Sequence, residues 1–252
     1  MHQGLSICAT LTYAPEQLPP LGSLDREHGS AFIKALRQVV SRRGGPRLSF
    51  DMTGEYSPAP RMRPHYHVAL FSYVPLDRKE WAKSGSGNDE FTSAELTKAW
   101  GKGLVTYQPW SIGAAKYCAS HQAWKLTGDK GRAQRMVYGP DGEALGERAP
   151  EFHACSTRPG IGRRFFERYG EQALQLGFTV VKNKKVPLPG YYLRRGDVDH
   201  PELTEAARLA RHAEAVKAKA KREAQGVEAR LDAIEFCAQE RINRQARKSG
   251  FS

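Results

Sequence analysis

The sequence lacks any long hydrophobic run. No apolar stretch approaches the roughly 18 residues that a membrane-spanning helix needs. The opening residues, Met1-His2-Gln3-Gly4, also lack the basic and then apolar order of a signal peptide. Cysteine is scarce too: the four cysteines are widely spaced and none forms a Cys-x-x-Cys pair, which argues against a zinc ribbon or a thioredoxin-like site. Together these absences predict a cytoplasmic protein with reduced thiols and no membrane partner.

Negative charge is in short supply. The chain has 39 Lys and Arg residues against 27 Asp and Glu residues, which gives a net charge of +12 and a pI of about 9.6. Between Ser156 and Gly196, nine basic residues stand against two acidic ones. Such a cluster favours a polyanionic partner; nucleic acid is the commonest, and an anionic membrane surface is the alternative. The candidate DNA contacts are Arg158, Arg163, Arg164, Lys182, Lys184 and Lys185.

Hydrophobic periodicity predicts an α+β fold. Alternation with a period of two indicates strands, and apolar stripes with a helical period indicate helices. The predicted strands cover residues 5–13, 48–56, 63–71, 104–110, 151–156 and 178–181, and the predicted helices cover 25–43, 93–100, 111–126, 165–176 and much of the chain after 201. We expect a central antiparallel sheet of about five strands with packed helices, and a helical C-terminal tail. The expected domains are 1–196, with a basic portion 156–196, and a charged helical extension, 197–252.

A histidine pair opens one predicted strand, in Arg63-Pro64-His65-Tyr66-His67. Side chains alternate along a strand, so His65 and His67 point one way and Tyr66 points the other. Alone, such a pair is more often two imidazoles on a half-exposed strand. The preceding strand joins it through a short loop, and an antiparallel hairpin would bring Glu55 onto the same face. Two imidazoles and a carboxylate predict a site for a hard or borderline divalent cation, with coordination positions left open.

A tyrosine on a predicted helix supplies a candidate nucleophile. Tyr117, His121 and Lys125 are spaced four residues apart and so share one face of the helix. A tyrosine hydroxyl can attack phosphorus if a cation or base favours its phenolate, and Lys125 or Lys116 could neutralise the developing charge. Taken alone, Tyr117 is more often an amphipathic residue at a helix–sheet boundary. Three other tyrosines compete for the role: Tyr107, Tyr138 and Tyr169.

Five motifs, in this order, resemble the replication initiators of small single-stranded DNA phages. They are Thr10-Leu11-Thr12-Tyr13, Gly54-Glu55-Tyr56, Arg63-Pro64-His65-Tyr66-His67, Ala115-Lys116-Tyr117 and Ser156-Thr157-Arg158-Pro159-Gly160-Ile161-Gly162. The chain looks like an initiator of the Microviridae (gokushovirus-like), a member of the HUH endonuclease superfamily, and the resemblance covers residues 7–170. Any one motif alone is weak, whereas the second, third and fifth together are specific.

The resemblance implies a nickase and strand transferase for rolling-circle replication. Such enzymes use Mg²⁺ or Mn²⁺, cut one strand of origin DNA, stay on its 5′ phosphate through tyrosine, and leave a 3′ hydroxyl for the host helicase and polymerase in the bacterial cytoplasm. His65 and His67 match the metal-binding pair, and Glu55 matches the acidic third ligand. Tyr117 matches the first tyrosine of a Tyr-x-x-x-Tyr helix motif.

The sequence departs from that family pattern at two positions of the helix. His121 stands where the second tyrosine is expected, which implies a single nucleophile, and Trp124 occupies one expected place of the lysine, with Lys125 after it. The cysteine-rich segment that often precedes the first strand is also absent. Two alternatives stay open: a non-catalytic origin-binding protein with an HUH fold, and a relaxase or transposase of the same superfamily.

Overall fold

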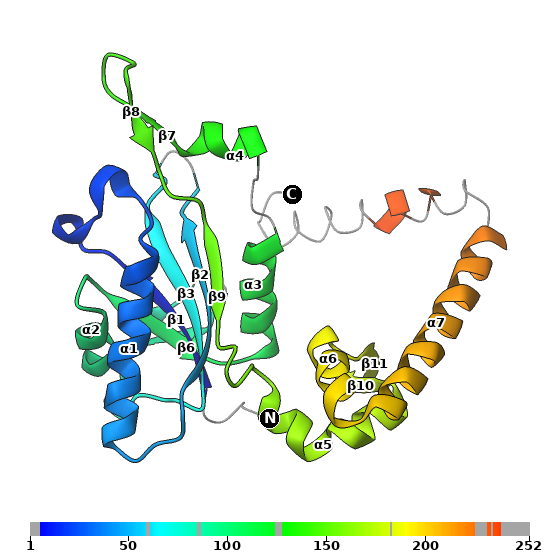
Figure 1. The fold of residues 1–252 in the computed structure, drawn as a ribbon. Helices are drawn as coiled ribbons and strands as arrows, with labels where there is room; N and C mark the ends of the chain where they lie inside the picture. The colour runs from blue at the N-terminus through cyan, green and yellow to red at the C-terminus, as the bar shows by residue number, and fades with distance from the viewer. Residues whose placement is uncertain are drawn as a thin grey trace. The chain divides into compact units, whose positions relative to one another are not determined.

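The computed structural model describes residues 6–58, 61–84, 87–123, 128–181, 183–224, 231–232 and 234–237. The chain forms two compact units, residues 1–163 and 164–252, and each is described by itself (Figure 1). The sequence placed the domain boundary between residues 196 and 197. That position lies inside the helix Gly190–Asp199 rather than in a linker.

The first unit is built on one large sheet. Its elements in chain order are β1 (Ser6–Thr12), the 3₁₀ turns η1 (Pro15–Gln17) and η2 (Pro20–Gly22), α1 (Arg26–Arg42), β2 (Ser49–Tyr56), β3 (Pro64–Phe71), β4 (Lys79–Lys83), β5 (Asp89–Thr92), α2 (Ala94–Trp100), β6 (Val105–Pro109), α3 (Ile112–Ala123), α4 (Gly128–Arg135), β7 (Met136–Tyr138), β8 (Ala144–Glu147) and β9 (Phe152–Cys155). The strand order in the sheet is β4-β5-β6-β1-β3-β2-β9, and every pairing is antiparallel.

This arrangement confirms the predicted α+β class and the antiparallel sheet. The sheet has seven strands rather than about five. The two additional strands are β4 and β5, which are five and four residues long, and the side chains of β4 are all exposed. Strands of this kind carry no apolar alternation, because neither face of β4 is buried.

The main core lies between one face of the sheet and helices α1 and α2. The buried apolar residues of the strands point to this side, for example Leu11, Met52 and Tyr66, and meet Phe32 of α1 and Trp100 of α2. Helix α1 begins at a side-chain cap, in which the Asp25 carboxylate accepts hydrogen bonds from the amides of Glu27 and His28. Helix α3 packs against β2 on the opposite side of the sheet (Figure 1).

The second unit has a smaller core. It comprises α5 (Arg163–Leu176), the hairpin β10 (Phe178–Val181) and β11 (Lys184–Pro187), α6 (Gly190–Asp199) and α7 (Pro201–Ala224). Its buried apolar residues are Phe166, Ala173, Leu174 and Leu188. Helix α7 is mostly exposed along its length, in line with the predicted solvated tail. No helix in the described part of the chain has the length and apolar character needed to span a bilayer.

Candidate metal centre

The candidate metal ligands come together on two paired strands. In the register of β2 and β3, Glu55 lies directly opposite His65, and Thr53 lies opposite His67. Opposed residues of an antiparallel pair share a face of the sheet, so the carboxylate and both imidazoles project to the same side. One ligand atom from each of Glu55, His65 and His67 lies within 4.8 Å of the others.

Two of these three polar side chains are buried. Glu55 is 5% exposed and His67 is 7% exposed, whereas His65 is half-buried. A carboxylate at this depth is stable only when positive charge or hydrogen-bond donors compensate its lost hydration. A divalent cation held between the carboxylate and two imidazoles supplies that compensation, and half-buried His65 leaves one side of the group open to solvent and substrate. The donor set therefore fits Mn²⁺ or Mg²⁺ with free coordination positions.

Hydrogen bonds behind the imidazoles orient their ring nitrogens. His65 Nδ1 lies 3.3 Å from the carbonyl oxygen of Arg63, and a carbonyl can only accept, so Nδ1 of His65 carries the proton. This leaves Nε2 of His65 as the nitrogen with a lone pair. His67 Nδ1 lies 3.2 Å from Oγ1 of Thr10 on β1. Partners of this kind fix the ring of a ligating histidine and raise its basicity.

Tyr66, which lies between the two histidines, anchors the strand from the opposite face. Its side chain is fully buried. The Tyr66 hydroxyl lies 2.7 Å from the hydroxyl of Tyr13 and donates a 2.7 Å hydrogen bond to the carbonyl of Asp25. It also accepts a hydrogen bond from the amide of Asp25. Because the side-chain period of a strand is two, this anchor fixes the register that turns His65 and His67 toward the other side.

A glycine next to Glu55 permits a close contact between β2 and β9. Gly54 pairs with Phe152 across the strands. A Cβ atom on Gly54 would lie 2.5 Å from Cε1 of Phe152, a distance that the rigid ring cannot accept without a shift. The Phe152 ring in turn packs on Tyr66 and under the Arg26 guanidinium. The Gly-Glu-Tyr motif thus combines a packing requirement at Gly54 with a polar group at Glu55.

Helix α3 covers the polar face through a pair of thiols. Cys118 of α3 is buried, and its Sγ lies 3.6 Å from the Sγ of Cys8 on β1. The hydrogen bond from Cys8 lowers the pKa of Cys118, while burial and the carboxylates of Asp51 and Glu55 oppose that shift. The electrostatic effect of Glu55 on Cys118 places this part of α3 above the metal-ligand candidates.

The predicted catalytic residues lie on or just after this helix. Tyr117 and His121 belong to α3, in which Tyr117 directly precedes Cys118. Their side chains, like the whole of Lys125, lie outside the described residues. The backbone therefore places residue 117 on the helix that packs over the metal-ligand candidates, and the roles of Tyr117, His121 and Lys125 stay predictions.

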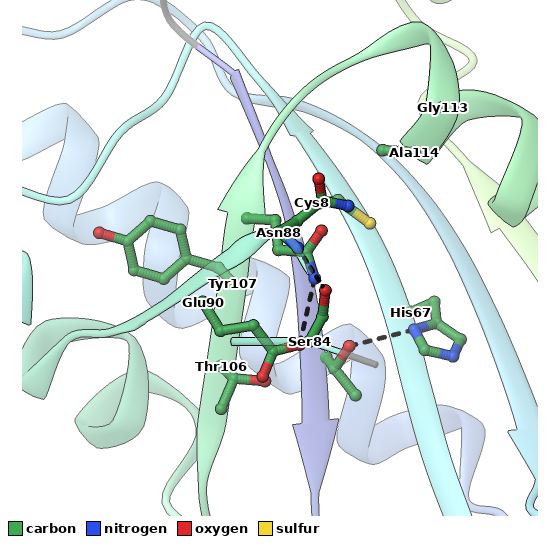
Figure 2. A pocket seen from close by; sticks show the side chains of 11 residues that line it. Cys8, His67, Ser84, Asn88, Glu90, Thr106, Tyr107, Gly113 and Ala114 are labelled. Carbon is green, nitrogen blue, oxygen red and sulfur yellow. Dashed lines mark hydrogen bonds between the residues drawn. The ribbon is translucent and has the colours of Figure 1, made fainter. Parts of the chain in front are cut away.

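A pocket opens beside His67 on the same face of the sheet (Figure 2). Its volume is about 580 Å³, and its lining comes from β1, β3, β5, β6 and the start of α3. Polar side chains dominate one wall, including Thr10, Thr106 and Gln108, and the Gln108 amide donates a 3.1 Å hydrogen bond to Glu90. A pocket of this size is within the range that holds a small ligand.

Known proteins match most of the chain. The family model of replication-associated proteins of the ORF2 type matches residues 6–123. The replication-associated protein VP4 of Bdellovibrio phage phiMH2K is 30% identical over 202 residues, which cover 78% of this chain and 59% of that protein. The replication-associated protein ORF2 of Spiroplasma virus 4 is 29% identical over 195 residues, which cover 74% of this chain and 56% of that protein. The chain belongs to the phage replication-associated protein family.

The matched residues include every candidate metal ligand and α3. The chain spans 59% and 56% of the lengths of these two relatives. No solved structure matches the chain.

The competing tyrosines of this chain have clear placements. Tyr107 is buried on the core side of β6, where its ring lies 5.7 Å from that of Phe91, and burial raises its pKa to about 12. Figure 2 shows its ring directed away from His67. Tyr138 and Tyr169 are exposed on β7 and α5. A raised pKa disfavours the phenolate, so Tyr107 is a poor nucleophile.

The candidate DNA contacts are divided between the two units. Arg158 is exposed in a tight turn, closed by the bridge between Thr157 and Gly160, and Arg163 lies at the end of the first unit. The remaining described members of the set, Arg164, Lys184 and Lys185, are exposed in the second unit. Lys182 lies outside the described residues.

The sequence reasoning missed a second group of possible ligands. Asp51, His153 and Cys155 each offer an atom within 4.8 Å of the others. The alternation of His153 and Cys155 on the short predicted strand 151–156 was a signal that both face one way. Only the pairing of β9 with β2, which joins residues about one hundred positions apart, shows that Asp51 lies opposite Cys155.

Proposed function

We propose that this chain is a metal-dependent DNA nickase that starts rolling-circle replication through a covalent tyrosine intermediate. The observation that carries the proposal is the convergence of Glu55, His65 and His67 on one face of the sheet. The family relationship supports a role in DNA replication. The proposed substrate is single-stranded origin DNA, which suits the net charge of +12.

The side chains of this cluster have a defined task in the proposal. Glu55 Oε and one nitrogen each of His65 and His67 would bind Mg²⁺ or Mn²⁺. The bound ion would supply positive charge to the scissile phosphate, which lowers the barrier for attack at phosphorus. The hydrogen bonds from His65 to Arg63 and between His67 and Thr10 hold the rings in place before substrate arrives.

The proposed nucleophile is the hydroxyl of Tyr117. Its oxygen would form a bond to phosphorus as the bond from phosphorus to the 3′ oxygen breaks, and the proton lost by tyrosine would be balanced by one gained on the 3′ oxygen. The products are a 5′-phosphotyrosine and a free 3′ hydroxyl, from which a host polymerase can extend, with a host helicase opening the duplex. Lys125, or Lys116 on α3, would offset the negative charge that develops on the phosphate.

His121 in place of a second tyrosine has a mechanistic consequence. With one tyrosine on the face, the same residue must release the strand before it can attack again, so a hand-off between two tyrosines is ruled out in this proposal. The pocket beside His67 would hold a nucleotide next to the scissile phosphate, because its lining offers hydrogen-bond donors and acceptors.

The test uses Mn²⁺ and a tiled set of single-stranded oligonucleotides from the replicon that encodes the protein. Mass spectrometry of the digested reaction should find a nucleotide adduct on the peptide that contains Tyr117. The Tyr117→Phe variant should lose the adduct and keep its DNA affinity, and Tyr138→Phe, an exposed tyrosine on β7, should behave as wild type. Binding without any metal-dependent cleavage would instead support an origin-binding protein.

A relaxase or transposase of the same chemistry would be distinguished by substrate. Such an enzyme would cleave the ends of mobile DNA more readily than the replication origin. The oligonucleotide set should therefore include both kinds of sequence, and preferential cleavage of the origin supports the initiator role.

A further inference from the structure

A second group of ligand-type side chains lies on the same sheet. Asp51 pairs with Cys155 across β2 and β9, and Thr53 pairs with His153, so these residues share the face that carries Glu55. The possible ligand atoms of Asp51, His153 and Cys155 all lie within 4.8 Å of one another. Asp51 is four residues before Glu55 on one strand, which separates the two groups by about 13 Å at a strand rise of roughly 3.3 Å per residue.

The backbone holds this second group rigidly. The amide of Ser156, next to Cys155, donates a 2.9 Å hydrogen bond to the carbonyl of Phe50, and the amide of Phe50 donates a 3.0 Å bond back to Oγ of Ser156. His153 and Cys155 therefore project from a strand that is fastened at its end. Ligands on strands keep their geometry better than ligands on loops.

The chemistry of the donors differs between the two groups. Glu55, His65 and His67 offer one oxygen and two nitrogens, whereas the second group offers an oxygen, a nitrogen and a sulfur. Thiolate ligands select Zn²⁺ and other borderline or soft ions, and oxygen-rich sites suit Mg²⁺ and Mn²⁺. His153 is partly exposed, so an ion can reach the group from solvent.

We propose that Asp51, His153 and Cys155 form a second cation site, which takes Zn²⁺ or a similar borderline ion. The Nε2 of His153 lies 2.5 Å from Oδ1 of Asp51, so both side chains already turn toward a common point. Bound Zn²⁺ would exchange this hydrogen bond for two metal–ligand bonds of about 2.0–2.2 Å and a sulfur bond of about 2.3 Å. Three protein ligands leave the fourth tetrahedral position to water.

This site would fasten the edge strand β9 to β2. β9 lies beside β2 at one edge of the sheet (Figure 1). The proposal does not depend on nicking, because it uses none of the residues assigned to the nickase. Burial, with a contribution from the Asp51 carboxylate, raises the pKa of the Cys155 thiol, so metal binding at neutral pH would release a proton and tighten as the pH rises.

The test is a Co²⁺ titration of the metal-free, full-length protein, because Co²⁺ replaces Zn²⁺ and reports a thiolate ligand by a charge-transfer absorption band. One band that saturates near one equivalent and disappears on addition of Zn²⁺ is expected. Cys155→Ser should abolish the band, and His153→Ala should weaken Co²⁺ binding about 10-fold or more. No band in the wild type, or a band that survives Cys155→Ser, would overturn the proposal.

Matched variants separate this site from the other thiols and from the first cluster. Cys118→Ser and Cys237→Ser should keep the band, and so should Glu55→Gln, which disables the proposed nickase site. Loss of the band in Cys118→Ser with retention in Cys155→Ser would assign the ion elsewhere and refute the proposal. Thermal melting of each variant shows that it is folded.

A measurement on the wild type alone avoids the risk of a misfolded variant. Zn²⁺ should protect Cys155 from alkylation by iodoacetamide and leave the exposed Cys237 reactive, as read by peptide mass spectrometry. Equal alkylation of Cys155 with and without Zn²⁺ would count against the site.

Discussion

The two units of the protein place their polar residues in opposite ways. In the first unit, Glu55 and His67 are buried on a sheet whose other face is a large apolar core. In the second unit, Lys184 and Lys185 are exposed on a hairpin beside a core of four buried apolar residues. Buried charge has to be held rigidly and compensated, whereas exposed charge needs neither. The first design suits chemistry at a fixed point, and the second suits adaptable contact with a charged backbone.

The most severe way to break the first design is to remove a buried ligand. His67→Ala should lower Mn²⁺-dependent nicking by about 100-fold or more, because one stabilising group in a preorganised site is lost. His212→Ala, on the exposed part of α7, is the matched control and should leave nicking unchanged. Initial rates on single-stranded DNA give the comparison, and circular dichroism shows whether both variants are folded. Full nicking by His67→Ala would remove His67 from the metal site.

The rigidity of the first unit can be tested at Gly54. Gly54→Ala should lower the free energy of unfolding by about 1–3 kcal/mol, because its Cβ collides with the Phe152 ring. Urea denaturation measures the change. Adding Phe152→Leu should recover part of the loss, since it gives the new methyl group room. A Gly54→Ala protein as stable as wild type would show that the close contact of β2 and β9 can relax.

The anchor beneath the histidine pair gives a similar test. Tyr66→Phe removes a buried hydroxyl that lies against Tyr13 and bonds to both backbone groups of Asp25, and should cost about 1–3 kcal/mol. Tyr138→Phe, at an exposed position, should change stability by less than about 0.5 kcal/mol. Similar unfolding midpoints for both variants would contradict the anchoring role.

The smallest effect is expected in the second unit. Changing Lys184 and Lys185 together to Gln should weaken single-stranded DNA binding and reduce the salt slope of log K by about 0.7 for each phosphate that the variant no longer neutralises. Lys221→Gln, on α7, serves as the control outside the basic stretch. Fluorescence anisotropy over a range of salt concentrations gives the slope. An unchanged slope in the double variant would show that this hairpin does not bind phosphate.

Much of the sheet was predictable because its strands alternate. The apolar residues of β1, β2 and β3 recur every second position, and the short loop before Arg63 predicted the hairpin that sets Glu55 against His65. The helix α1 and the strand β10 were predicted on similar grounds. By contrast, β4 is exposed along its whole length and leaves no pattern to detect.

The rest of the candidate site depended on distant pairing. Nothing in the sequence places β9 beside β2, so Asp51 could not be joined to His153 and Cys155 in advance. The contact between Cys8 and Cys118, which seats α3 on the sheet, joins residues 110 positions apart. The division between the units at Arg163 was also hidden, because helix α5 begins there with no Pro- or Gly-rich linker inside it.

The proposed metal centre can be observed directly by diffraction from crystals soaked in Mn²⁺. An anomalous map should show one strong peak in contact with Glu55, His65 and His67, at about 2.0–2.3 Å from an atom of each. In crystals of Glu55→Gln the same peak should be weak or missing. A map with no peak among these three side chains in the wild type, or with the ion held by other residues, would contradict the assignment of the nickase site.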